Sequence, residues 1–125
     1  MTKRLSILLV DDNPSIAIAL TDVLELKDFT VHLADSGKKA LALLKVHPVD
    51  VMITDVIMTE MNGLELYQAT KKIYPKLITM FMTAYAAEDL IQQGLKEGIK
   101  TVLNKPVDMD FLILLLKSFE DNLAE

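Results

Sequence analysis

The chain has 125 residues, of which 51% are hydrophobic and 25% charged, and this fits one globular domain with a sizeable core. It contains no cysteine, so disulfides, thiolate metal sites and cysteine nucleophiles are excluded, and the reducing cytoplasm is the compartment that fits best. The chain has 13 Lys and Arg residues and 18 acidic residues, and the resulting formal charge of −5 argues against direct nucleic-acid binding. No apolar run approaches the roughly 20 residues of a membrane span.

Short apolar runs alternate along the chain with helical patterns, which is typical of repeated strand–helix units. Each of five predicted strands is followed by a predicted helix. The strands are residues 5–10, 29–34, 49–54, 77–83 and 100–104. The first helix begins at Pro14 and its buried stripe runs to Leu24, and the other helices are residues 37–47, 63–74, 86–96 and 109–123. Because the strands are apolar on both faces, we expect an α/β fold, a doubly wound five-stranded parallel sheet of (βα)5 units that fills residues 1–125 as one domain.

Polar and charged residues follow four of these strands. They are Asp11 and Asp12, Asp55, Thr83, and Lys105. In an open α/β sheet, ligands bind outside the carboxyl ends of the strands. We therefore expect these side chains to share one crevice if the strand order brings their four strand ends together.

Three carboxylates in one crevice repel one another unless a cation enters. A hard divalent cation with oxygen ligands meets that need, and Mg²⁺ suits a site with few carboxylates and several waters. Lys105 adds a second positive charge and Thr83 a hydroxyl donor. This combination is suited to stabilising a phosphoryl group during its transfer.

The motifs around these residues resemble those of one known family, the receiver domain of two-component response regulators. The resemblance covers essentially the whole chain, with each motif at the end of the expected strand. The motifs are Val10-Asp11-Asp12-Asn13, Asp55-Val56-Ile57-Met58 followed by Asn62-Gly63, Thr83-Ala84, and Lys105-Pro106. It implies a flavodoxin-like fold with strand order 2-1-3-4-5 and a cis peptide bond between Lys105 and Pro106.

The resemblance also implies a role for each residue of the site. Asp55 would be the nucleophile that takes a phosphoryl group from a phosphohistidine on a sensor histidine kinase or phosphotransfer protein. Asp12, Asp55 and the backbone carbonyl of Ile57 would hold Mg²⁺, while Asp11 orients a metal-bound water.

In the same scheme, Thr83 would hydrogen-bond a phosphoryl oxygen and Lys105 would pair with it. Phosphorylation would shift the population of an active state that signals to a partner or effector domain. The resemblance thus implies a signalling module rather than an enzyme, although it takes part in phosphotransfer to its own aspartate.

The sequence departs from the family pattern at several positions. Val102 occupies the place of the usual switch aromatic, so we expect activation to be transmitted by backbone movement and dimerisation instead. Ile57 and Tyr85 lie two residues beyond Asp55 and Thr83, at positions that govern water access in the family. Neither carries an acid or amide that could orient water, so we expect slow self-dephosphorylation.

The last predicted helix has more apolar residues than one buried face requires. Leu112, Ile113 and Leu116 suffice to cover the sheet, which leaves a second apolar set pointing at least partly outward. A helix that is apolar on more than one face usually has a second partner. We interpret the outward set as a possible homodimer or docking surface: Phe111, Leu114 and Leu115.

Two alternative functions are weighed against the phosphoacceptor. A phosphatase of the haloacid dehalogenase type also uses a strand-end aspartyl phosphate, but it needs a second aspartate two residues later, where this chain has Ile57. A phosphorylation-independent, receiver-like interaction module would share the fold. Such a module need not retain the acidic, hydroxyl and lysine residues of the site, so their presence favours phosphorylation: Asp12, Asp55, Thr83 and Lys105.

Overall fold

The computed structural model describes residues 4–84 and 86–123, and strands and helices alternate throughout them. The strands are β1 (Ser6–Val10), β2 (Thr30–Ala34), β3 (Val51–Asp55), β4 (Ile78–Thr83) and β5 (Val102–Asn104). The helices are α1 (Pro14–Leu26), α2 (Gly37–Val46), α3 (Gly63–Ile73), α4 (Glu88–Glu97) and α5 (Met109–Leu123). Among the described residues, no helix is long and apolar enough to cross a membrane.

The five strands form one parallel sheet in the order β2-β1-β3-β4-β5, which confirms the predicted fold and strand order. Because β1 and β3 are neighbours, residues directly after β1 lie beside the end of β3. The ends of β4 and β5 adjoin them on the other side. The topology therefore places the residues that follow β1, β3, β4 and β5 along one edge.

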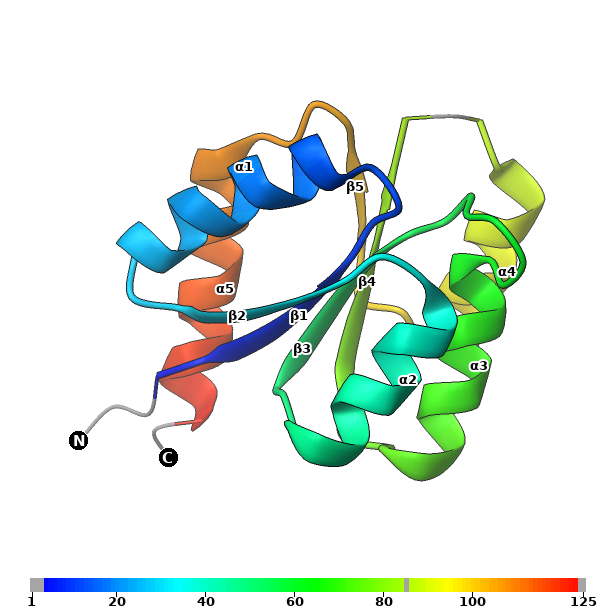
Figure 1. Cartoon of the computed structure of the whole chain (residues 1–125), viewed down its shortest axis with the longest axis horizontal. Coiled ribbons are helices and arrows are strands. Elements are labelled where there is room, and N and C mark those ends of the chain that lie inside the picture. Colours follow the sequence, from blue (N-terminus) through cyan, green and yellow to red (C-terminus); the bar gives the residue numbers. More distant parts are fainter. Residues whose placement is uncertain (1–3, 85, 124–125) are drawn as a thin grey trace.

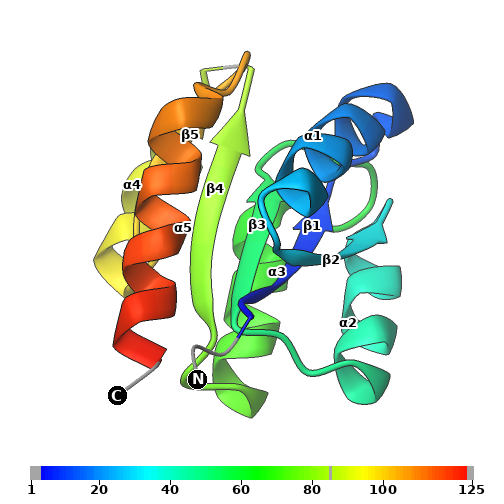
Figure 2. The same ribbon diagram turned by 90° about the vertical axis from the view of Figure 1, so that its left-hand side faces the viewer.

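Helices cover both faces of the sheet. Figure 1 shows α1 and α5 on one side and α2, α3 and α4 on the other, and Figure 2 looks onto the side with α1 and α5. The core on that side joins strand residues to both helices. It includes Ile7, Leu9, Ile53, Met80, Leu20, Leu24, Leu112 and Leu116. Burial on both faces explains why the strands read as continuous apolar runs rather than as alternating patterns.

Element boundaries differ from the prediction by one or two residues. The fourth helix begins at Glu88 rather than at residue 86, and its N-cap residue Ala87 makes no side-chain capping hydrogen bond. The fifth strand is shorter than predicted and covers only Val102–Asn104. The third strand extends to Asp55 itself, so this carboxylate is held by a strand end rather than by a loop.

Helix α4 packs unusually close to β4. A Cβ atom added to Gly94 would lie 2.5 Å from Phe81 Cε2 and 2.9 Å from Phe81 Cζ. The Phe81 ring is fully buried, and the residue opposite it on β5 is Val102. Glycine inside a helix costs about 1 kcal/mol relative to alanine, so its presence here is explained by the ring it accommodates.

We predict that Gly94→Ala lowers the free energy of unfolding by about 1–3 kcal/mol, although alanine favours helix, because the added methyl overpacks the core. Phe81→Leu should relieve this clash, so the double variant should be more stable than the sum of the two single effects predicts. Urea unfolding of the four proteins measures this. Strict additivity would show that Gly94 does not accommodate the ring.

Candidate functional site

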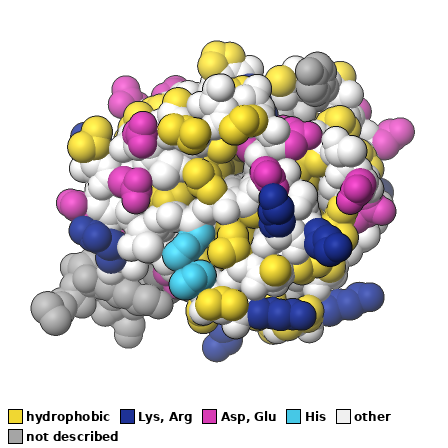
Figure 3. All heavy atoms as spheres, viewed as in Figure 1, with side chains coloured by type: hydrophobic (Ala, Val, Ile, Leu, Met, Phe, Trp, Pro, Cys, Tyr) yellow, Lys and Arg dark blue, Asp and Glu magenta, His cyan; other side chains and the backbone are white. Residues whose placement is uncertain are grey.

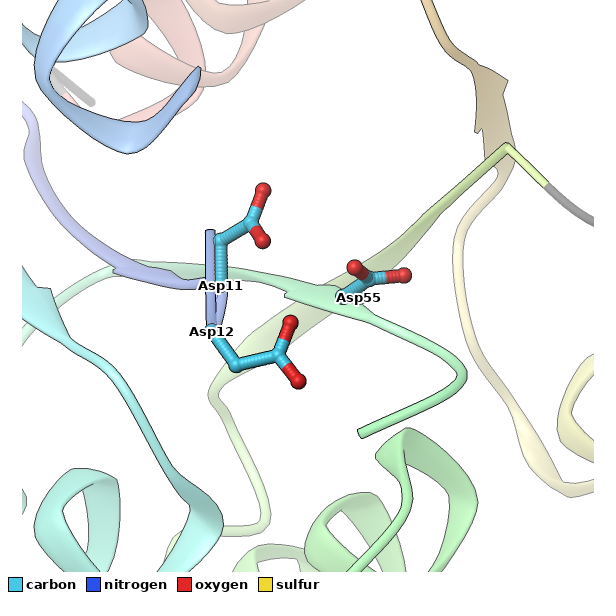
Figure 4. A group of neighbouring side chains, drawn as sticks. All are labelled: Asp11, Asp12 and Asp55. Carbon is cyan, nitrogen blue, oxygen red and sulfur yellow. The ribbon is translucent and has the colours of Figure 1, made fainter. Parts of the chain in front are cut away.

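Three carboxylates meet at the carboxyl end of the central strands. Asp11 and Asp12 directly follow β1, and Asp55 is the last residue of β3. One carboxylate oxygen from each lies within 4.8 Å of the others, and Figure 4 shows Asp11 and Asp12 extending toward Asp55. The structure therefore brings together the three acidic residues that the sequence predicts for one crevice.

The turn after β1 is held by its own polar residues. Asp11 Oδ1 accepts a hydrogen bond from the Asn13 N–H at 2.9 Å. Asn13 in turn caps α1, because its side-chain oxygen accepts from the N–H groups of Ser15 and Ile16 at 3.1 and 3.3 Å. These bonds fix the turn that carries Asp11 and Asp12 to the first residues of α1.

Gly63 allows the start of α3 to lie against the backbone of Asp55. A Cβ atom at this position would be 2.4 Å from the Asp55 carbonyl oxygen and 3.0 Å from Val56 Cα. The helix starts here because Asn62 and Glu65 form a reciprocal capping box. The sequence indicates a helix start at Asn62-Gly63. It does not indicate that a side chain at position 63 would collide with the Asp55 backbone.

Lys105 reaches the carboxylates from the end of β5. Its ammonium nitrogen lies 2.8 Å from Asp55 Oδ2 and 3.0 Å from Asp11 Oδ2. Its backbone N–H donates to the carbonyl of Thr83 at 2.9 Å, which ties it to β4. The peptide bond between Lys105 and Pro106 is cis, as predicted.

Burial is the main influence on the ionisation of Asp55. It raises the pKa of this carboxyl, and the negative charge of Asp11 acts in the same direction. The hydrogen bond and charge of Lys105 oppose this rise, but the pKa of Asp55 stays above its ordinary value. For Lys105, burial lowers the pKa, but its contacts with Asp55 and Asp11 outweigh burial and leave the pKa raised.

Two buried carboxylate oxygens have no hydrogen-bond donor of good geometry within the described residues. They are Asp11 Oδ2, which makes only the ionic contact with Lys105, and Asp55 Oδ1. Buried oxygens of this kind are costly unless a donor or a cation satisfies them. Together with Asp12 they form a set of oxygen donors that fits Mg²⁺.

An open cleft of about 420 Å³ lies beside these oxygens. Its lining is partly polar and partly apolar. The lining residues are Asp12, Asn13, Ile16, Asp55, Ile57, Met58, Thr59, Ala84 and Lys105. The cleft leaves room for an oxygen-rich anion next to Asp55 and Lys105.

Thr83, Ile57 and Val102 lie in three different environments. Thr83 is buried at the end of β4 and does not line the cleft, whereas Ile57 does, with 43% of its surface exposed. Val102 is partly buried and packs in the cluster around Phe81, so an aromatic ring is present on β4 and not on β5. Tyr85 lies outside the described residues.

Comparison with known proteins identifies clear relatives. Residues 7–117 match the family model of the response regulator receiver domain. A response regulator receiver protein of Anaeromyxobacter is 37% identical over 100 residues, which cover 80% of this chain and 42% of that protein. The transcriptional regulatory protein ZraR of Klebsiella oxytoca is 34% identical over 91% of this chain and 26% of its own length. The chain therefore spans less than half of either relative.

The fold has close counterparts among solved structures. The crystal structure of a CheY-like response regulator receiver domain protein from Methanospirillum hungatei matches with a TM-score of 0.89 at 25% identity, and 96% of each chain is covered. The sheet and its helices are therefore shared over nearly their whole extent.

The raised pKa of Asp55 predicts a pH-dependent effect of its removal. Between the ordinary aspartate range and the raised pKa, the folded protein binds a proton that the unfolded chain releases, so unfolding becomes easier as the pH rises. In Mg²⁺-free buffer, Asp55→Asn should therefore raise Tm at neutral pH, and this gain should shrink in acid. Thermal melts over a pH series measure it. The exposed Asp35→Asn is the control, and a gain independent of pH would contradict the prediction.

Proposed function

This chain belongs to the response regulator receiver domain family, whose general function is phosphorylation on an aspartate, and we propose that Asp55 is the residue phosphorylated here. The observation that carries the proposal is the close grouping of Asp55 with Asp11, Asp12 and the Lys105 ammonium beside an open cleft. The whole of residues 1–125 is proposed to form this receiver domain.

Mg²⁺ is the cation that the family generally uses, and we assign it here to the carboxylates of Asp12 and Asp55 and the backbone carbonyl of Ile57, with the Asp11 carboxylate completing the site through a metal-bound water. When bound, it supplies positive charge that offsets the carboxylates and the incoming phosphoryl oxygens. The orphaned oxygens of Asp11 and Asp55 support this assignment.

Asp55 is the nucleophile in the proposed transfer. Its carboxylate oxygen forms a bond to phosphorus as the bond between phosphorus and the donor's histidine nitrogen breaks, which produces an acyl phosphate. The Lys105 ammonium, 2.8 Å from Asp55 Oδ2, is placed to pair with the phosphoryl oxygens. The hydroxyl of Thr83, at the end of β4, is proposed to donate to one of them after a local movement.

Receiver domains obtain their phosphoryl groups from histidine kinases. We propose a sensor histidine kinase or phosphotransfer protein as the donor for this chain, and the cytoplasm as its location. The relatives that extend beyond this chain include a transcriptional regulatory protein, so an effector that reads the phosphorylated state is part of the proposal.

The phosphorylated state is proposed to be long-lived. Ile57 lines the cleft beside Asp55 and carries no group that could orient an attacking water. Its apolar side chain also lowers the access of water to the acyl phosphate. Self-dephosphorylation is therefore expected to be slow.

Beryllofluoride with Mg²⁺ imitates the acyl phosphate and tests the function directly. We predict that it shifts backbone NMR signals around Asp55, Thr83 and Lys105, and that Asp55→Asn abolishes the response. Asp35→Asn, an exposed carboxylate after β2, is the matched control and should respond like the wild type. A wild-type protein that gives no shift would contradict phosphorylation and favour the phosphorylation-independent interaction module.

The phosphorylated protein is further proposed to form a homodimer through α5. Phe111 and Leu114 lie one turn apart on this helix with 51% and 72% of their surfaces exposed, as predicted. Leu115, which the sequence also assigned to the outward face, is only partly exposed and packs against the core, because it adjoins the buried side of the helix. The proposed surface therefore consists of Phe111 and Leu114.

Sedimentation with beryllofluoride and Mg²⁺ tests the dimer. The wild type should gain a dimer population, and the variant carrying both Phe111→Ser and Leu114→Ser should remain monomeric, because the apolar contact area is lost. Leu26→Ser, which changes a leucine on α1 that is 81% exposed, is the control. A wild type that stays monomeric at high concentration in both states would exclude the dimer.

A further inference from the structure

The only two histidines of the chain lie against each other, away from the carboxylate cluster. His32 belongs to β2, and His47 is the C-terminal cap of α2. Their rings are stacked, with centroids 4.6 Å apart and planes inclined by 16°. Figure 3 shows them side by side on the molecular surface, below the middle of the view. The proposed phosphorylation uses neither of them.

Both rings are attached to well-fixed backbone. His32 lies in the middle of β2, where it is paired with Leu8 of β1. The His47 N–H donates to the Leu43 carbonyl at 2.7 Å, and Pro48 follows directly. Because the fold itself holds the two side chains adjacent, little entropy is lost when both bind one ligand.

We propose that His32 and His47 form a binding site for a divalent transition metal of the imidazole-preferring group, with Zn²⁺ as its representative. Neutral imidazole nitrogens suit Zn²⁺, Ni²⁺ and Cu²⁺, whereas Mg²⁺ prefers oxygen ligands. The proposed Zn²⁺ site therefore differs in chemistry as well as in position from the proposed Mg²⁺ site. His47 is exposed and His32 is half-buried, so water can complete the coordination.

Binding requires a small rearrangement of the pair. With Zn–N distances of about 2.0–2.1 Å, two nitrogens on a tetrahedral ion lie about 3.3 Å apart. The lone pairs of nearly parallel rings point side by side rather than toward one point. Binding therefore requires the exposed His47 ring to change its rotamer, while β2 holds the position of His32. The stack seen here is thus the metal-free form of the site.

The test is calorimetric titration of ZnCl2 into tag-free protein in excess Mg²⁺, which occupies the carboxylates. The expected result is one Zn²⁺ per chain, with His47→Gln and His32→Gln each weakening binding at least tenfold. Lys45→Gln changes an exposed charge in the last turn of α2 and should leave the affinity unchanged. In the wild type, the ring proton signals of both histidines should shift together during the titration.

Equal affinity in the wild type and both histidine variants, or no binding at all, would overturn the proposal. His47 is exposed, so His47→Gln is expected to fold and carries the test even where His32→Gln disturbs the strand. The beryllofluoride response of Asp55 should be intact in His47→Gln. The result for zinc and the result for phosphorylation are therefore independent of each other.

Discussion

The mutual repulsion of three carboxylates is the constraint on which the site depends. Two unit charges 4 Å apart interact by about 4 kcal/mol at the effective dielectric constant of a protein surface. Asp11, Asp12 and Asp55 lie within 4.8 Å of one another, and the single ammonium of Lys105 cannot neutralise all three. Burial is the largest cause of the raised pKa of Asp55, and the charge of Asp11 adds to it against the opposing effect of Lys105. A bound cation would offset this repulsion and favour the ionised form of Asp55, which is the form that attacks phosphorus.

The parallel sheet makes this concentration of charge possible. Neighbouring β1 and β3 deliver their carboxylates to one edge, while the apolar strands are buried beneath helices on both faces. Close backbone approach completes the arrangement, because Gly63 lets α3 begin against Asp55 and Gly94 lets α4 lie on the Phe81 ring. The hydrophobic core thus stabilises an edge that electrostatics alone would not favour.

Much of this architecture was predictable from local patterns. Alternating apolar runs and helix caps located the elements, and the polar residues at strand ends identified the cluster of Asp11, Asp12 and Asp55 with Lys105. The order of the strands came only from the family resemblance, because hydrophobic periodicity carries no information on which strands pair. Contacts between distant elements were not predictable, because they depend on packing in three dimensions. Examples are the close approach of Gly63 to the Asp55 backbone, the partial burial of Leu115 and the stacking of His32 on His47.

Asp55, and not its two acidic neighbours, is proposed to receive the phosphoryl group. The most direct measurement is to phosphorylate the protein with a small-molecule phosphodonor and Mg²⁺, reduce the acyl phosphate with borohydride, and locate the modified residue by mass spectrometry. We expect modification of Asp55 alone, and its loss when Mg²⁺ is removed. Modification of Asp11 or Asp12 in the wild type, or none on any aspartate, would contradict it.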